Sequence, residues 1–431
     1  MAGLEPIGVG TSLCEDLASY FSRVAWNQYR APSGLVREVM ATGLGDALGP
    51  EAAQQAWRAE FAKITSRRTA SLIGSAQAAA TWARLLGSAT GRTDLEDLTL
   101  LAWGEVLPSK RLLRLTRAWC APCLARQRRQ REVVYAPLLW QVAEVAMCPE
   151  HEVRLETRCG ACGASPPIFT HWSRVGLCSC GERLELASLA PPVPVTGVEL
   201  DWQRFVAAEV GSLIAATPRL PARPDGSASA AAVYLSWERS GLSLKKLAKS
   251  IGLAVSTLSE WKDGRHQPSL PGALRLCRLA GVSLVPFLRG DLESMRAAPL
   301  PALPPLVEPS RERHRSIDWV AVRIELERAL ATGDPESLGQ IVRQLGLEYH
   351  QARRALPELC AAITSRYRAF AAARASDRFE RDAQLVRATV ASLRTEGLRP
   401  SRQRVQARLP APVTLRRPKL AGVWRDEVAQ S

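Results

Sequence analysis

Seven thiols and one imidazole lie between residues 119 and 181, and they come as four close pairs. Two ligands a few residues apart can reach one metal ion from a tight turn, and a second pair then completes a tetrahedron. The eight residues are Cys120, Cys123, Cys148, His151, Cys159, Cys162, Cys178 and Cys180. Eight ligands fill two tetrahedral sites and leave no position for water. The pattern therefore predicts two structural Zn2+ ions in a module at 119–187 and no hydrolase.

Spacing alone leaves the pairing open. Neighbouring pairs give one site with the first four ligands and one with the last four, whereas crossed pairing joins the first pair to the third and the second to the fourth. Gly160, Gly163 and Gly181 lie beside the ligands, where a zinc knuckle often needs a positive φ. Disulfides or isolated buried thiols are the alternative, and four close pairs in sequence favour zinc over them.

The charge balance favours a polyanionic partner. The chain has 431 residues, 57 Lys and Arg against 42 Asp and Glu, and a net charge of +15. Its first ten residues lack the features of a signal peptide, and no apolar stretch is long enough to cross a membrane. Cys14, Cys277 and Cys360 are isolated, as in a reducing compartment. We expect a cytoplasmic protein with no membrane partner.

Apolar residues at three- and four-residue steps predict a helical region at 1–118. Leu17, Phe21 and Val24 share one helix face, Pro32 starts a second helix, and 50–64 and 68–88 carry further periodic segments. A short helix follows the cap at Thr93 and Asp94. Farther along, Pro137 is predicted to start a helix that leads to Cys148 and buries a set of apolar residues: Leu138, Leu139, Val142 and Val145.

Basic residues are concentrated beside the first ligand pair. Arg126, Arg128 and Arg129 lie between the first two pairs, where a metal-stapled loop would hold their guanidinium groups outward to contact phosphate. A solvated surface explains the same pattern equally well, and both interpretations stay open.

Residues 229–296 have the pattern of a helix-turn-helix domain and resemble the phage-repressor class. Ser243 caps a first helix, Gly252 makes the turn, and a second helix at about 255–262 directs Val255, Leu258 and Trp261 inward. The side chains predicted to face the major groove are Ser256, Thr257, Ser259 and Lys262. Glu260 would repel phosphate, so light DNA contact, protein contact or a plain helical hairpin are the alternatives.

Proline-rich stretches suggest how the remainder is divided. Residues 188–228 form a linker with one short helix at 199–215, and 297–310 form a second linker. A second helix-turn-helix-like domain at 311–376 and a basic helical domain at 377–431 follow. From 311 to 431 there are 23 Lys and Arg against 14 Asp and Glu. The candidate DNA contacts here are Tyr349, His350, Gln351, Arg353, Arg354, Arg402 and Arg404.

The ordered motifs of residues 13–187 resemble the TniQ/TnsD family of transposition proteins. The opening helix at 15–23 and the segment at 98–103 are similar to that family. So are the ligand-bearing motifs at 118–124, 137–140 with 148–151, 159–162 and 176–180, while 357–367 is similar to the C-terminal part of TnsD-type proteins.

The resemblance implies a mainly α, multidomain target-selection protein of a mobile genetic element. Such a protein binds double-stranded DNA at an attachment site and recruits an AAA+ ATPase and a transposase for DNA transposition, a form of DNA recombination. Two alternatives remain: a TniQ-like bridge between a CRISPR effector complex with its guide RNA and the ATPase, and a zinc-containing transcription regulator. An enzyme is disfavoured, because the sequence has no GxxxxGK[ST] nucleotide-binding motif and no acidic cluster for nuclease metals.

Overall fold

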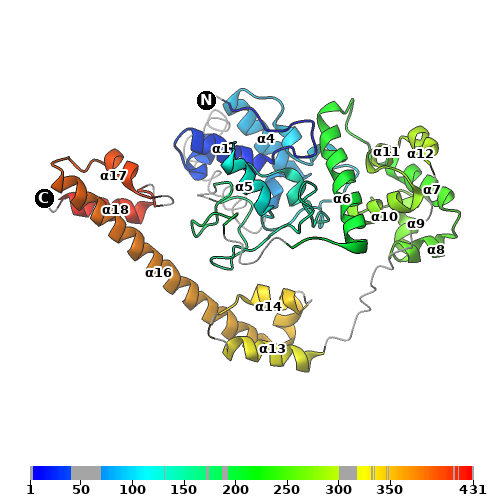
Figure 1. The fold of residues 1–431 in the computed structure, drawn as a ribbon. Coiled ribbons are helices and arrows are strands. Elements are labelled where there is room, and N and C mark those ends of the chain that lie inside the picture. The colour runs from blue at the N-terminus through cyan, green and yellow to red at the C-terminus, as the bar shows by residue number, and fades with distance from the viewer. Residues whose placement is uncertain are drawn as a thin grey trace, which may run out of the picture. The chain divides into compact units, whose positions relative to one another are not determined.

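The computed structural model is mainly helical, with isolated β-bridges joining its described loops. It describes residues 3–39, 69–130, 132–170, 174–186, 193–299, 318–331, 333, 335–345, 347, 349–410, 413–415 and 417–429. The chain divides into two compact units, 1–309 and 310–431 (Figure 1). Together with two cysteine-rich clusters and a helix-turn-helix arrangement, the helices confirm the predicted fold class.

The amino-terminal region packs on α1, Leu17–Asn27. Asp16 caps this helix, because its carboxylate accepts a hydrogen bond from the Ser19 amide at 2.6 Å. Leu17, Phe21 and Val24 are completely buried, as their spacing predicted. Residues 32–39 are also helical.

The rest of this region is built from short elements. The segment predicted as one helix at 68–88 is a 3-10 turn, η1 (Thr69–Leu72), followed by α4 (Gln77–Thr90). Two more 3-10 turns follow, η2 (Leu95–Leu98) and η3 (Leu101–Trp103). The helix predicted at 50–64 lies outside the described residues.

Among its described residues, the cysteine-rich region contains one α-helix, α5 (Ala121–Arg129). The helix predicted after Pro137 is wrong: only one 3-10 turn forms, η4 (Leu138–Gln141). The four apolar residues predicted to face inward are nevertheless completely buried. Val142 instead forms an antiparallel bridge with Leu113, so the backbone is paired across the region rather than along a helix.

Residues 188–228 were predicted as a linker with one short helix at 199–215. That helix is present as α6 (Gly197–Ala216), which has 20 residues and ends in η5 (Thr217–Arg219). Val206 and Val210 on α6 belong to the same hydrophobic core as the amino-terminal region and the helix-turn-helix region. The Gln203 side chain accepts from the Ala146 amide at 2.8 Å, and Glu209 accepts from the Leu284 amide. This helix therefore joins the cysteine-rich region to the helices that follow it.

Six short helices complete the first unit. They are α7 (Ala228–Ser240), α8 (Leu244–Ser250), α9 (Val255–Lys262), α10 (Leu270–Ala280), α11 (Leu284–Arg289) and α12 (Leu292–Ala297). Glycines in the left-handed conformation end α7, α10 and α11, at Gly241, Gly281 and Gly290, as is common at helix C-termini.

The second unit is organised along one long helix, α16 (Pro357–Thr395). At its amino-terminal end, α13 (Trp319–Ala331), α14 (Leu338–Gln344) and α15 (Tyr349–Ala355) form a first core. At its other end, α17 (Arg402–Arg408) and α18 (Pro418–Ala429) form a second core (Figure 1). One helix thus runs across the boundary predicted between 376 and 377.

None of the helices in the described part of the chain is both long and apolar enough to cross a membrane.

Candidate metal centres and nucleic-acid interface

The first ligand cluster joins the N-terminus of α5 to a tight turn. Cys120 is the residue before α5, and Cys123 lies in its first turn. Cys148 and His151 come from a turn closed by a hydrogen bond from the Glu152 amide to the Cys148 carbonyl at 2.8 Å. Glu152 has a backbone φ of +52°, which residues other than glycine rarely adopt. Neighbouring pairs, not crossed pairs, are therefore brought together.

The distances within this cluster fit a tetrahedral metal ion. The Cys123 and Cys148 sulfur atoms are 3.6 Å apart, and His151 Nδ1 lies 3.3 to 3.7 Å from the three sulfur atoms. Zinc–sulfur bonds of about 2.3 Å at tetrahedral angles place two sulfur atoms about 3.8 Å apart. These four residues could hold a metal ion, and their chemistry is compatible with zinc.

The second cluster has four thiols, from Cys159, Cys162, Cys178 and Cys180. Cys159 Sγ lies 3.8 Å from Cys180 Sγ, and Cys162 Sγ lies 3.6 Å from Cys178 Sγ. Both separations fit tetrahedral zinc and are far longer than a disulfide bond, and all ten cysteines are free thiols. Positive φ angles at Gly163 (+67°) and Gly181 (+92°) shape the two turns, as expected; Gly160 has no positive φ.

Within each cluster the thiols shift one another's pKa in opposite directions: the pKa of one thiol falls, and the pKa values of two neighbouring thiols rise. Hydrogen bonds from Cys120 and Cys123 lower the pKa of the Cys148 thiol to about 2. Hydrogen bonds from Cys178 and Cys180 lower the pKa of Cys162 to about 2. Zinc is bound by thiolates, so a cation bound at the centre of a cluster would lower the pKa of all its thiols.

Buried ion pairs fasten α1 to the cysteine-rich region. Glu15 is completely buried, pairs with Arg23 at 2.6 Å and accepts a hydrogen bond from the Ser19 hydroxyl at 2.6 Å. The Ser19 hydroxyl in turn accepts from the Ala136 amide. Asp16 lies 3.7 Å from Arg117, and both are buried. The polar residues of the 15–23 motif thus hold the first helix against the loop that leads to Pro137.

The three arginines predicted to point outward differ from one another. The prediction that Arg128 points outward is wrong. Arg128 pairs with Glu185 at 2.5 Å and donates a hydrogen bond to the Gly176 carbonyl at 3.1 Å, so it connects α5 to the second cluster. Arg126 is partly exposed and pairs with Glu150 beside the first cluster. Arg129 is exposed on α5 and stays available to a partner.

The helix-turn-helix at α8 and α9 is built as its sequence predicted. The Ser243 hydroxyl accepts from the Lys246 amide, Gly252 makes the turn at a φ of +70°, and Leu258 and Trp261 are buried. The prediction that Val255 points inward is wrong, because this residue begins α9 and its side chain is 41% exposed. Ser256 is exposed, and Thr257, Ser259 and Lys262 are partly exposed on the same helix.

Sequence reasoning missed three lysines on the preceding helix. Lys245, Lys246 and Lys249 are exposed on α8. In helix-turn-helix domains the first helix crosses the DNA backbone, where lysines can neutralise phosphates. The run Leu244-Lys-Lys-Leu-Ala-Lys249 carried this signal, because its leucines take the inner face of the helix and leave the lysines outside.

In the second unit the predicted contact residues are distributed between its two ends. Arg353 and Arg354 are exposed on α15, whereas Tyr349 and Gln351 are partly buried and Tyr349 packs on the first core. The side chain of His350 lies outside the described residues. At the other end, Arg402 is exposed but donates to the Leu415 carbonyl at 2.9 Å, and Arg404 donates to the Arg399 carbonyl at 3.3 Å.

Comparison with protein-family models gives two matches. Residues 6–155 match the family described as TniQ, which covers the amino-terminal region and the first ligand cluster. Residues 238–287 match the family described as Helix-turn-helix, which covers α8 to α10. A search of curated proteins gives no match.

Proposed function

We propose, from the match of residues 6–155 to the TniQ family, that this chain selects DNA target sites for a transposon. The TniQ domain and the helix-turn-helix domain fit a transposition-associated DNA-binding protein. The observation that carries the proposal is that α6 joins both domains in one hydrophobic core. A site contacted by the second domain is thereby held at a set position relative to the first.

In this proposal the DNA contacts come from exposed cationic and polar side chains. The α8 lysines contact phosphates, and Ser256 and its neighbours on α9 face the major groove. Arg353 and Arg354 on α15 contact base edges. Arg129 adds a phosphate contact beside the metal centres. The TniQ domain recruits the AAA+ ATPase, which brings the transposase to start DNA recombination.

Both clusters are proposed to hold structural Zn2+. Cys120, Cys123, Cys148 and His151 would hold one ion, and Cys159, Cys162, Cys178 and Cys180 the other. A bound zinc ion supplies cross-linking of distant turns rather than chemistry, because four protein ligands leave no place for substrate. We therefore propose a binding protein of the cytoplasm and not an enzyme.

Two other functions would use the same parts differently. A bridging subunit of a CRISPR-associated transposon would obtain its specificity from a guide RNA, and would need no base contacts of its own. A zinc-containing transcription regulator would bind DNA without an ATPase partner. The exposed α8 lysines favour direct duplex binding over the bridge.

The test combines site selection with a partner assay. The purified chain is incubated with random duplexes, and recovered sequences are compared before and after the triple substitution Lys245→Ala, Lys246→Ala and Lys249→Ala. Each lost phosphate contact lowers the slope of affinity against salt by about 0.9 in log–log units. Enrichment of one sequence, together with binding of a transposition AAA+ ATPase, supports target selection. No enrichment supports the bridge, and enrichment without ATPase binding supports the regulator.

A further inference from the structure

We propose that α16 is a rigid spacer that sets the modules at its two ends on two stretches of one DNA duplex, about one helical turn apart. The first module, residues 318–377, contains α13 to α15; the second, residues 378–431, contains α17 and α18. This inference rests on the proposed function and adds the architecture of the target site.

The middle of α16 is exposed among the residues that the structure describes. Cys360 and Ile363 are buried in the first core, and Ala383, Val386, Val390 and Leu393 are buried in the second. All seven residues at 371–377 are exposed, and four of them are alanines. Alanine has the highest helix propensity, so this segment stays helical without packing. A flexible linker would connect the modules equally well, but it would not fix their separation.

The length of the spacer matches the repeat of DNA. Cys360 and Val386, one from each core, are 26 positions apart. At about 1.5 Å per residue, they are separated by about 40 Å along the helix. Two sites on the same side of a duplex repeat every 34–36 Å or so, about 10 base pairs. The two modules can therefore contact adjacent turns from one side.

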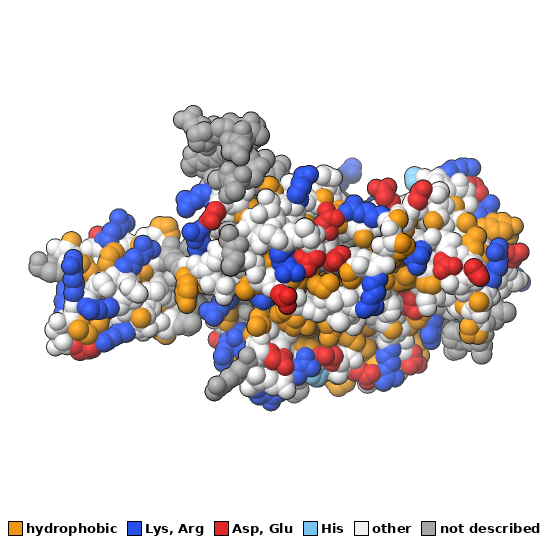
Figure 2. Space-filling model, turned by 90° about the horizontal axis from the view of Figure 1, so that it is seen from above, with side chains coloured by type: hydrophobic (Ala, Val, Ile, Leu, Met, Phe, Trp, Pro, Cys, Tyr) orange, Lys and Arg blue, Asp and Glu red, His pale blue; other side chains and the backbone are white. Residues whose placement is uncertain are grey.

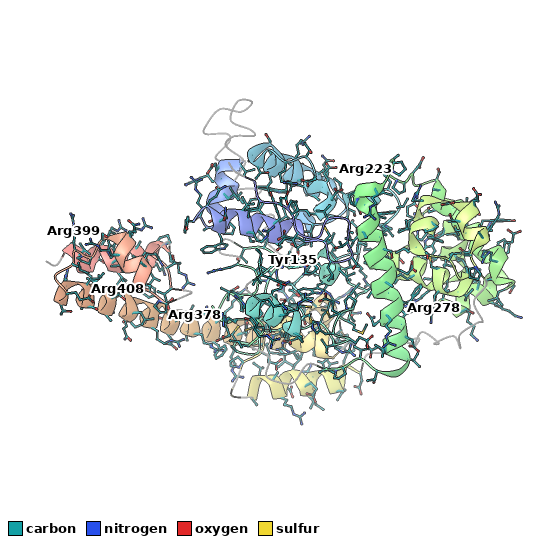
Figure 3. All side chains as sticks on the ribbon, turned by 45° about the horizontal axis from the view of Figure 1, so that its top comes forward. Tyr135, Arg223, Arg278, Arg378, Arg399 and Arg408 are labelled. Atoms are coloured by element: carbon teal, nitrogen blue, oxygen red, sulfur yellow. The ribbon has the colours of Figure 1, made fainter. Side chains whose placement is uncertain are left out.

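The two modules differ in net charge: the second is strongly basic and the first is neutral. The second module has 12 Lys and Arg against 5 Asp and Glu, whereas the first has 8 against 8. Figure 2 shows basic side chains spread over the lobe formed by α17 and α18. Arg378 lies on α16, and Arg399 and Arg408 lie in the second module (Figure 3). Phosphate attraction thus comes chiefly from the second module, which holds the neutral first module near its bases.

Arginines also line the spacer itself. Arg374, Arg378 and Arg381 are four and three residues apart, so they share one face of α16. Arg374 lies over the Phe370 ring at 5.4 Å, and Arg381 is exposed. These cations face the phosphates that would separate the two contacted stretches.

The test lengthens the spacer in the full chain. A second copy of residues 371–377 is inserted after Asp377, which adds two helical turns and about 10.5 Å. Hydroxyl-radical footprinting on the selected duplex should show two protected stretches about 10 to 12 base pairs apart for the unaltered chain. The lengthened chain should bind that duplex at least tenfold more weakly and should select duplexes with a different spacing.

A matched control keeps the length. The double substitution Ala372→Gln and Ala373→Gln replaces exposed residues with good helix formers and should leave affinity and footprint unchanged. Circular dichroism checks that the lengthened chain has gained helix. Equal affinity of the lengthened and unaltered chains, or a single protected stretch, overturns the spacer and leaves target selection intact. Failure of the unaltered chain to select any duplex instead overturns the proposed function.

Discussion

Arginine has different roles in the two units of this protein. In the first unit, some arginine side chains are drawn into the structure: Arg23 is 11% exposed and Arg117 is 8% exposed, and both face buried carboxylates. Other arginines of this unit, such as Arg154, form their ion pairs in solvent. In the second unit, comparable ion pairs lie in solvent, such as Arg328 with Glu325 at 75% and 42% exposure. The first unit uses its cations to hold distant segments together, whereas the second leaves many of them accessible to a partner.

This difference follows from how each unit is stabilised. The first has few long elements around its two cysteine-rich clusters, so buried ion pairs and backbone bridges hold its turns, together with the metal ions proposed for the clusters. The second consists of helices that satisfy their own backbone, with two small cores on α16. Basic residues therefore indicate DNA binding only where the fold leaves them exposed. The number of basic residues in the whole chain overstates how many are available to DNA.

Removal of zinc should produce the largest difference in stability between the two units. Chelation, or Cys148→Ser at one site, should unfold residues 119–181, because structural zinc contributes on the order of 10 kcal/mol to folding. The helices of the second unit should persist, since both of its cores lack metal ligands among their described residues. Hydrogen exchange measured by region, with metal analysis giving two zinc ions per chain, tests this. Fewer than two ions would contradict the site assignment.

The two cysteine-rich clusters could be predicted because their signal in the sequence is local. Cys159 and Cys162 are close in sequence, and a turn brings both to one point whatever surrounds them. Capping at Ser243 and the period of Leu17, Phe21 and Val24 are local in the same sense. The choice between neighbouring and crossed pairs required the folded chain.

Three features depend on contacts that the sequence does not display. Arg128 looks like its neighbour Arg129, but its partners Gly176 and Glu185 are about fifty positions away. The helix predicted after Pro137 gave way to bridges with a distant segment. The continuity of α16 was missed because its exposed middle has no apolar period, and only the intrinsic propensity of alanine keeps it helical.

The buried pair of Glu15 and Arg23 tests whether charges in the first unit are structural. Glu15→Ala leaves Arg23 and the Ser19 hydroxyl without their partner inside the protein, which should cost about 3–5 kcal/mol. Urea unfolding followed by hydrogen exchange of α1 measures the loss. The matched control is Glu199→Ala, which breaks a pair with Arg154 that is 47% exposed on both sides. Glu199→Ala should lower the free energy of unfolding by less than about 1 kcal/mol. Equal losses for the two variants would contradict a structural role for the buried pair.

Arg128 and Arg129 sharpen the comparison within one helix. Arg128→Ala should destabilise the first unit by about 1–3 kcal/mol, because Glu185 is only 4% exposed and is left with the more distant Arg183, at 3.7 Å. Its effect on the salt dependence of DNA binding should be negligible. Arg129→Ala should leave stability unchanged and lower the salt slope by about 1 if it contacts phosphate. Urea unfolding and binding at several salt concentrations distinguish them, and identical profiles would show that exposure does not separate their roles.

The titration of Asp16 should give the smallest and most specific effect on stability, because burial destabilises its charged form more than its partners stabilise it. Burial raises the pKa of Asp16 to about 6, although Arg117 and the Ser19 amide act in the opposite direction. Its ordinary value is 3.8. As the pH falls below 6, the native state takes up this proton before the unfolded state does. The folded state therefore gains stability toward pH 4, and that contribution is absent above pH 6.

Asp16→Asn isolates this titration, because asparagine keeps the helix cap and carries no proton to gain. Between pH 7 and pH 5, the wild type should gain about 1 kcal/mol of stability relative to the variant. Both proteins keep Glu15, Arg23, Arg117 and all eight ligands, so loss of zinc in acid affects them alike and cancels in the difference. A difference that stays flat across this range would show that Arg117 fully compensates the buried charge. The first unit would then hold its acidic residues without the cost that distinguishes it from the second.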